Sequence, residues 1–153
     1  IEDAKIIFMV LCDSVCRRMR EQGFRANTVC ISVRDTDLQS FTRQKKLDVS
    51  TNITKDVLSV CIELFKENYA FSKNIRSLGV SVTDFEADTL SHQTSIFVSE
   101  EEVIKSEKLD STLKNIKNRF GNYSIKPAKL MFDRSLSGFN PKEEHTVHPV
   151  GFF

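Results

Sequence analysis

The sequence lacks the features that identify several large classes of protein. No run approaches the ~18 consecutive apolar residues that a membrane-spanning helix requires. The apolar stretch near the start, residues 6–12, is only seven residues long. It has no basic region before it and no small-residue cleavage site, so it is typical of a buried helix face rather than a signal peptide. The formal net charge is only +1, so any nucleic-acid binding must come from local patches.

Cysteines are few and are not spaced for metal binding. The four are Cys12, Cys16, Cys30 and Cys61. All fall in segments with the pattern of regular structure, without a CxxC pair or a nearby histidine. We therefore expect buried, reduced thiols in a cytoplasmic protein, in preference to a disulfide or metal framework.

Catalytic motifs are also missing, among them GxGxxG, GxxxxGK[ST], HExxH and GxSxG. His145 and His148 form at most half of a metal site, and we interpret them as solvated loop residues. Asp35 and Asp37 have the spacing of a two-metal carboxylate pair on a strand, but they lie where a hairpin must turn, which favours a turn. We expect neither an active site nor a cofactor in this chain.

The spacing of apolar residues in the sequence predicts a clear order of helices and strands. Apolar residues at helical spacing predict a helix over 2–22 that ends at Gly23, and another from about Thr54. Period-two alternation predicts strands over 28–34 and 76–84, and the basic run 40–47 predicts a return strand at a sheet edge. This order matches an α+β, ferredoxin-like βαββαβ sandwich without its first strand: an antiparallel sheet with two helices on one face.

The character of the sequence changes after residue 86. We expect a first domain over 1–86, a linker over 87–102, and a C-terminal helix with an irregular tail over 103–153. The helix has an apolar stripe and ends at Gly121; the stripe is Leu109, Leu113, Ile116 and Phe120. One short strand is expected around 125–132.

Hydrogen-bond donors are concentrated on the predicted sheet. The candidate nucleic-acid contacts are Arg34, Thr42, Arg43, Gln44, Lys45, Lys46, Arg76, Ser77 and Ser81. Their groups suit phosphate oxygens, and without stacking aromatics such a surface would contact the backbone rather than the bases. From the residues alone, a solvated sheet edge protected by lysines is an equal alternative.

Three runs, "CRRMREQG", "FTRQKKL" and "LGVSV", resemble the little-finger domain of bacterial Y-family translesion DNA polymerases, in both the DNA polymerase IV and the UmuC-like branches. The resemblance covers residues 1–85. It implies that the sheet holds primer–template duplex through its backbone in the major groove. The matching positions are Thr42, Arg43, Lys45, Arg76 and Ser77. Ser77 and Ser81 stand where arginine is common in the family.

The resemblance also implies that the chain is a C-terminal piece of a larger enzyme. The palm carboxylates that would bind Mg²⁺ for nucleotidyl transfer are not in this sequence, so we expect no polymerase activity from it alone. The family's first strand is missing too. We expect the central slot that it would leave to be filled by part of 123–153 or by a strand from a neighbouring molecule.

A pentapeptide similar to QLSLF follows the little finger in UmuC-like polymerases and docks on the sliding clamp. Here "QTSIF", residues 93–97, resembles it. Gln93 would supply amide hydrogen bonds beside Ser95, and Ile96 and Phe97 would be paired apolar anchors. Two alternatives stay open: the apolar pair packs on its own domain, or the chain is a regulatory or protein-interaction module without DNA binding.

Overall fold

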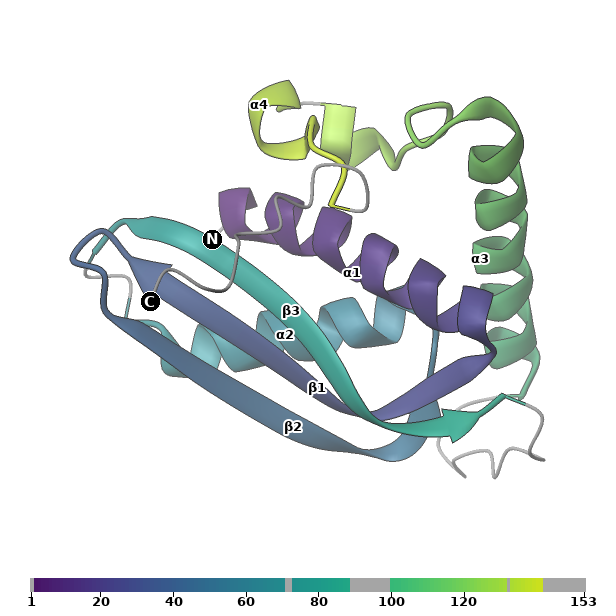
Figure 1. Ribbon diagram of the computed structural model, residues 1–153, viewed down its shortest axis with the longest axis horizontal. Coiled ribbons are helices and arrows are strands. Elements are labelled where there is room, and N and C mark those ends of the chain that lie inside the picture. Colours follow the sequence, from purple (N-terminus) through teal and green to yellow (C-terminus); the bar gives the residue numbers. More distant parts are fainter. Residues whose placement is uncertain (1, 71–72, 89–99, 132, 142–153) are drawn as a thin grey trace, which may run out of the picture.

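The computed structural model describes residues 2–70, 73–88, 100–131 and 133–141, which form an α+β fold (Figure 1). In chain order its elements are α1 (Glu2–Gln22), β1 (Phe24–Asp35), β2 (Ser40–Thr51), α2 (Thr54–Asn68), β3 (Ile75–Ala87), α3 (Glu100–Phe120), the 3₁₀ helix η1 (Ala128–Met131) and α4 (Arg134–Ser137). The predicted order of helix, strand, strand, helix and strand is confirmed. So is the α+β class, and the arrangement is consistent with a ferredoxin-like sandwich.

The three strands form one antiparallel sheet in the order β2-β1-β3 (Figure 1). β2 lies at an edge, as predicted. β1 pairs with β3 from Phe24 opposite Ala87 to Asp35 opposite Ile75. The slot that we expected between these strands therefore does not exist, and the expectation that a tail or a neighbouring molecule fills it is wrong. β3 itself pairs with the backbone groups of the central strand.

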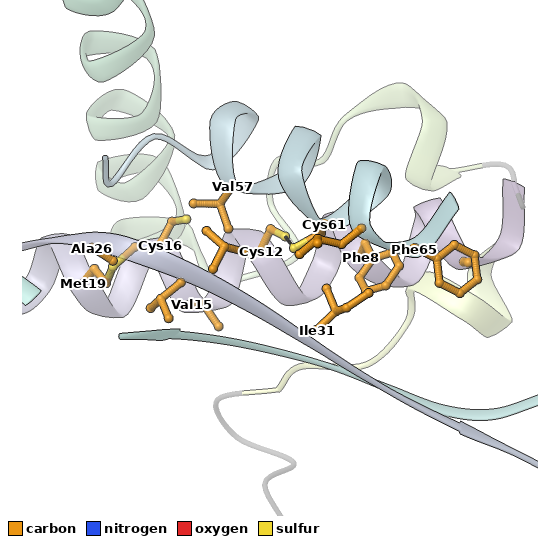
Figure 2. Close-up of a cluster of buried hydrophobic side chains, with 14 of the residues drawn as sticks. Phe8, Cys12, Val15, Cys16, Met19, Ala26, Ile31, Val57, Cys61 and Phe65 are labelled. Carbon is orange, nitrogen blue, oxygen red and sulfur yellow. Dashed lines mark hydrogen bonds between the residues drawn. The ribbon is translucent and has the colours of Figure 1, made fainter. Parts of the chain in front are cut away.

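The core lies between the sheet and the two helices α1 and α2, as Figure 2 shows. Its residues include Phe8, Cys12, Val15, Cys16 and Met19 of α1, Val29, Ile31 and Val33 of β1, and Val57, Cys61 and Phe65 of α2. The rings of Phe8 and Phe65 meet edge to face, with centroids 5.5 Å apart. Apolar burial of this kind contributes about 25 cal/mol per Å² to the free energy of unfolding.

Three of the four thiols lie in this core, as predicted, and only Cys30 is partly exposed. Cys12 Sγ donates a hydrogen bond to Cys61 Sγ at 3.7 Å (Figure 2). Burial raises the pKa of the Cys16 thiol to about 12. These thiols therefore act as small apolar side chains.

The helix ends follow their local signals only in part. Gly23 and Gly121 adopt positive φ angles of 71° and 95° and end α1 and α3, as predicted. The start of α2 is capped by a side chain of another helix. Its N-cap residue is Ile53, whose side chain accepts no hydrogen bond. Instead, Asp110 of α3 accepts the backbone N–H of Thr54 at 2.8 Å, a favourable place for a carboxylate at a helix N-terminus.

The described part of the C-terminal segment consists of turns and two short helices, η1 and α4. The short strand expected around 125–132 is wrong for these residues, because 128–131 form η1. Pro127 has no N–H for a strand ladder, and its carbonyl accepts the N–H of Leu130 at 2.9 Å to begin a turn. A mostly apolar cleft of about 380 Å³ lies between this segment and the helices α1, α2 and α3. Within the described ranges, no helix is long and apolar enough to cross a membrane.

Candidate nucleic-acid interface

One face of the sheet packs on α1 and α2, and the opposite face has no described helix against it. Side chains alternate along a strand, so the residues between the buried Val29, Ile31 and Val33 point to this opposite face. We call it the outer face. Its residues are Thr28, Cys30, Ser32 and Arg34 on β1, Ser40, Thr42, Gln44 and Lys46 on β2, and Ser77, Gly79, Ser81 and Thr83 on β3. Among these residues, neutral hydroxyl and amide groups outnumber cations, and none is aromatic.

The structure brings most of the predicted contact residues together on this outer face. They are Arg34, Thr42, Gln44, Lys46, Ser77 and Ser81. Cys30 of the central strand lies opposite Gln44 on one side and opposite Ser81 on the other. The polar surface is therefore continuous across all three strands.

Two predicted contacts do not lie on the outer face. Arg43 pairs with Ile31 and Lys45 pairs with Val29, and both partners are completely buried against the helices. The two basic side chains therefore point to the helix side of the edge strand. The sequence predicts one basic surface from the run 40–47. Side chains alternate along a strand, however, so the basic residues of this run are divided between two faces of the sheet.

Both of these side chains are held by α2. Lys45 Nζ lies 2.5 Å from the Glu63 carboxylate. Arg43 Nε donates to Asn68 Oδ1 at 2.9 Å. The two cations on the helix side thus have different partners, a charged one for Lys45 and a neutral one for Arg43.

Arg76 lies where the pairing of β1 with β3 is irregular. Arg34 pairs with Ser77, whereas the next residue, Asp35, pairs with Ile75, so Arg76 is the extra residue between them. Its side chain is exposed. Arg34 and Arg76 therefore place two cations near the hairpin end of the sheet.

The opposite end of the sheet is acidic. Thr28 donates to the Asp84 carboxylate, and Asn27 donates to Glu86 at 2.6 Å. Asp84 has a positive φ of 56°, an unusual conformation that bends β3 at this point. Two cations, Arg34 and Arg76, thus lie at the hairpin end, and two carboxylates, Asp84 and Glu86, lie at the other end, where Lys46 is opposite Thr28.

The hairpin carboxylates belong to the turn, as the sequence favoured. Asp35 Oδ1 accepts the backbone N–H groups of Asp37 and Gln39 at 2.9 and 3.0 Å. Lys73 Nζ lies 2.6 Å from Asp37. No group of three or more potential metal ligands is found in the part of the chain that the structure describes, and His145 and His148 lie outside that part.

Sequence reasoning missed a polar network that attaches α3 to the rest of the protein. Arg25 of β1 is only 4% exposed, and its Nε lies 2.5 Å from Asp88 Oδ1. The same guanidinium also binds Glu107 of α3. Arg20 of α1 donates to Asp110 of α3 at 2.9 Å. The sequence carried no signal for this network, because Arg25 precedes the strand predicted over 28–34 and its partners lie far along the chain.

A second part of this network lies further along α3. Lys117 Nζ is 2.6 Å from Asp13, and its side chain is only 8% exposed. Arg17 of α1 is buried and donates to Asn122 Oδ1, just beyond α3, at 2.9 Å. α3 is therefore joined to α1 by two ion pairs, one at Asp110 in the middle of α3 and one at Lys117 near its C-terminal end.

Comparison with known proteins decides the family. The model of the impB/mucB/samB family C-terminal domain matches residues 1–96. The chain belongs to this family. Its similarity to DNA polymerase IV of Acetivibrio thermocellus is 39% identity over 137 residues, or 89% of this chain and 34% of that protein. DNA polymerase IV 2 of Bacillus subtilis is 33% identical over 127 residues, or 81% of this chain and 30% of that protein.

A putative UV-damage repair protein, UvrX of Bacillus subtilis, is 29% identical over 127 residues, 81% of this chain and 30% of that protein. The predicted resemblance to the C-terminal region of Y-family polymerases is confirmed. The chain spans about a third of the length of the curated relatives that it matches. The similarity to the Acetivibrio protein covers more of the chain than the family model does, so it continues past this C-terminal domain.

The segment predicted to bind a clamp, residues 93–97, lies at the end of the range that the family model matches. Gln93, Ser95, Ile96 and Phe97 lie outside the described residues. The residues that flank the segment are described: the Asp88 N–H donates to the Gly23 carbonyl at 2.9 Å, and Arg25 joins Asp88 to Glu107. Both flanks are therefore attached to the same point of the domain.

Proposed function

We propose that this chain is the DNA-holding C-terminal region of a Y-family translesion DNA polymerase, and that its outer face grips primer–template duplex. The observation that supports this best is a sheet face without a described helix, lined by neutral donors and the cations Arg34 and Lys46. The parent protein would perform Mg²⁺-dependent nucleotidyl transfer in its other domains, in the bacterial cytoplasm.

The composition of the outer face predicts how it binds DNA. Hydroxyl and amide donors hydrogen-bond to phosphate oxygens without releasing counterions, whereas each cation that meets a phosphate adds to the salt dependence. Three cations, Arg34, Lys46 and the adjacent Arg76, are available. We expect log K to fall with log[salt] with a slope of about −2 to −3, which is shallow for a DNA-binding protein.

The test is fluorescence anisotropy with a labelled primer–template duplex over a series of salt concentrations. Lys46→Ala should weaken binding and make the slope shallower by about 1, because one phosphate contact is lost. Lys105→Ala removes the same charge from the exposed side of α3 and is the matched control. Binding that is absent at low salt, or that does not weaken as salt rises, would contradict the proposal.

Cys30 offers a second, independent test, because its partly exposed thiol lies at the centre of the outer face. Duplex DNA should slow alkylation of this thiol. The buried Cys12, Cys16 and Cys61 serve as internal references. If duplex at saturating concentration leaves the alkylation rate of Cys30 unchanged, the DNA does not occupy the outer face.

We also propose that residues 93–97 dock on a sliding clamp, with Ile96 and Phe97 filling an apolar pocket. Clamp pull-down compares the wild-type chain with Ile96→Ala plus Phe97→Ala, which should lose retention. Leu90→Ala plus Val98→Ala is the matched control, because it removes two apolar side chains just outside the motif. Equal retention of both double variants would remove the motif from consideration.

The alternative is a regulatory or protein-interaction module on the same fold. Such a module would bind through a helix face or a strand edge, and its binding would not follow duplex concentration or salt in the way described above. The anisotropy series therefore separates the two functions.

A further inference from the structure

Arg43 and Lys45 are two residues apart on one face of an edge strand, and they bind different kinds of side chain on α2. Lys45 forms an ion pair with Glu63, and the two side chains are 44% and 43% exposed. Arg43 is held by two neutral oxygens, Asn68 Oδ1 at 2.9 Å and the Thr42 carbonyl at 2.8 Å. The charge of Lys45 is thus largely neutralised within the protein, whereas the charge of Arg43 is not.

The Glu63 carboxylate offers Lys45 the same chemistry as a phosphate oxygen: an anionic acceptor at hydrogen-bond distance. The hydrogen bond to Glu63 raises the pKa of Lys45 above its ordinary value, and Glu67 and Asp48 add negative charge nearby. A phosphate that approaches Lys45 must therefore displace the Glu63 carboxylate and overcome repulsion from Glu67 and Asp48. Because the pair is exposed, the displacement is possible at modest cost.

The position of the pair makes this competition relevant to the DNA. β2 is an edge strand of the sheet, so no described strand pairs with its outer edge. Lysine has a long, flexible side chain that can swing around the edge of a strand. A duplex on the outer face whose backbone passes along β2 comes within reach of Lys45 and Arg43.

We propose that Glu63 is an internal competitor for DNA phosphate at Lys45, and so restrains the affinity of this domain for duplex. The inference rests on the proposed DNA-binding function. Arg43 has no carboxylate in its two hydrogen bonds, so no such competitor acts on it. Lys45 contributes fully only when Glu63 is removed.

The experiment measures duplex affinity and its salt slope for the 153-residue chain and five variants. Glu63→Gln should tighten binding about 2- to 5-fold at low salt, the range for freeing one exposed ion pair. Its salt slope should become steeper by up to about 1, since one more phosphate is contacted. Lys45→Ala should cost more affinity in the Glu63→Gln background than in the wild type. Glu101→Gln makes the same change of charge on the exposed surface of α3 and is the control.

The outcomes are distinguishable. If the wild type binds duplex with the expected salt dependence but Glu63→Gln binds no more tightly than Glu101→Gln, only the inference about Glu63 fails. It also fails if Glu63→Gln with Lys45→Ala keeps the whole gain, because the gain then does not act through Lys45. If the wild type does not bind duplex at all, both proposals fail. Glu63→Ala, with circular dichroism of each variant, checks that the result does not depend on one substitution or on misfolding.

Discussion

α1 and α3 are helices of equal length that are attached to the protein by opposite means. α1 packs on the sheet through Phe8, Cys12 and Met19, all of them apolar and almost fully buried. α3 is held by Asp110, Glu107 and Lys117, while its apolar Leu109 and Phe120 are 59% and 65% exposed. Apolar packing tolerates a change of neighbour, whereas a buried ion pair fails when one partner is lost. A substitution in the core should therefore destabilise the protein by leaving a cavity. A substitution at the α3 interface should destabilise it by leaving a buried charge without its partner.

The largest effect is expected in the core. Phe8→Ala should lower the free energy of unfolding by about 3–5 kcal/mol, because it removes a fully buried ring that meets Phe65 and leaves a cavity. Urea unfolding followed by circular dichroism measures the loss. Phe120→Ala removes the same ring from an exposed site on α3, and a comparable loss there would end the distinction between the two helices.

A smaller effect, of a different kind, is expected at the α3 interface. Asp110→Ala leaves the Arg20 guanidinium without its carboxylate and the Thr54 N–H without its acceptor. We expect a loss of about 3 kcal/mol, the lower end for breaking a buried ion pair, since both side chains keep some contact with water.

Hydrogen exchange identifies where the Asp110→Ala loss occurs. The amides of α3 should exchange faster, while those of α2 around the buried Val57 and Cys61 should change less. Glu101→Ala, an exposed carboxylate on the same helix, is the control. Equal acceleration throughout the protein would mean that α3 and the core unfold as one unit.

The smallest effect is expected where the C-terminal segment meets α1. Hydrogen bonds from Lys129 of η1 and from Lys5 lower the pKa of the Glu2 carboxyl from 4.5 to about 2. Because the folded state favours the charged carboxylate, this contribution is present above pH 4.5 and is lost as pH falls towards 2.

The stability difference between the wild type and Glu2→Gln should therefore be constant near neutral pH and should shrink between pH 4.5 and 2. Unfolding midpoints measured over this range check it. A difference that does not change with pH would show that Glu2 does not anchor the segment through its charge.

The sequence predicted the elements well, because their signals are local. Gly23, Gly121 and the alternation through Val29, Ile31 and Val33 each act within a few residues, and all gave the expected structure. The direct pairing of β1 with β3 was not predicted, because it joins residues about fifty positions apart by backbone hydrogen bonds that carry no side-chain signal. The division of the chain into domains stays a prediction.

The candidate site was predictable to the same extent. The strands that carry it were right, and their residue types gave a polar face. The sequence could have predicted which face Arg43 and Lys45 occupy. Phe41 and Leu47 are on the same face of the strand, and both are apolar and pack against the core. The ion pairs of Arg20 and Arg25 with α3 were not available, because only the folded chain brings Asp110 and Glu107 to them.

Phe41 and Leu47 also fix the register of β2 against β1, because both pack against the core. A slip of one residue against β1 would turn Arg43 and Lys45 to the outer face and Thr42 and Gln44 towards α2. The charge of the outer face would then change without any change in composition, but both apolar side chains would have to leave the core. Two ordinary packing residues thus decide which half of the basic run faces outward, and with it the charge of the outer face.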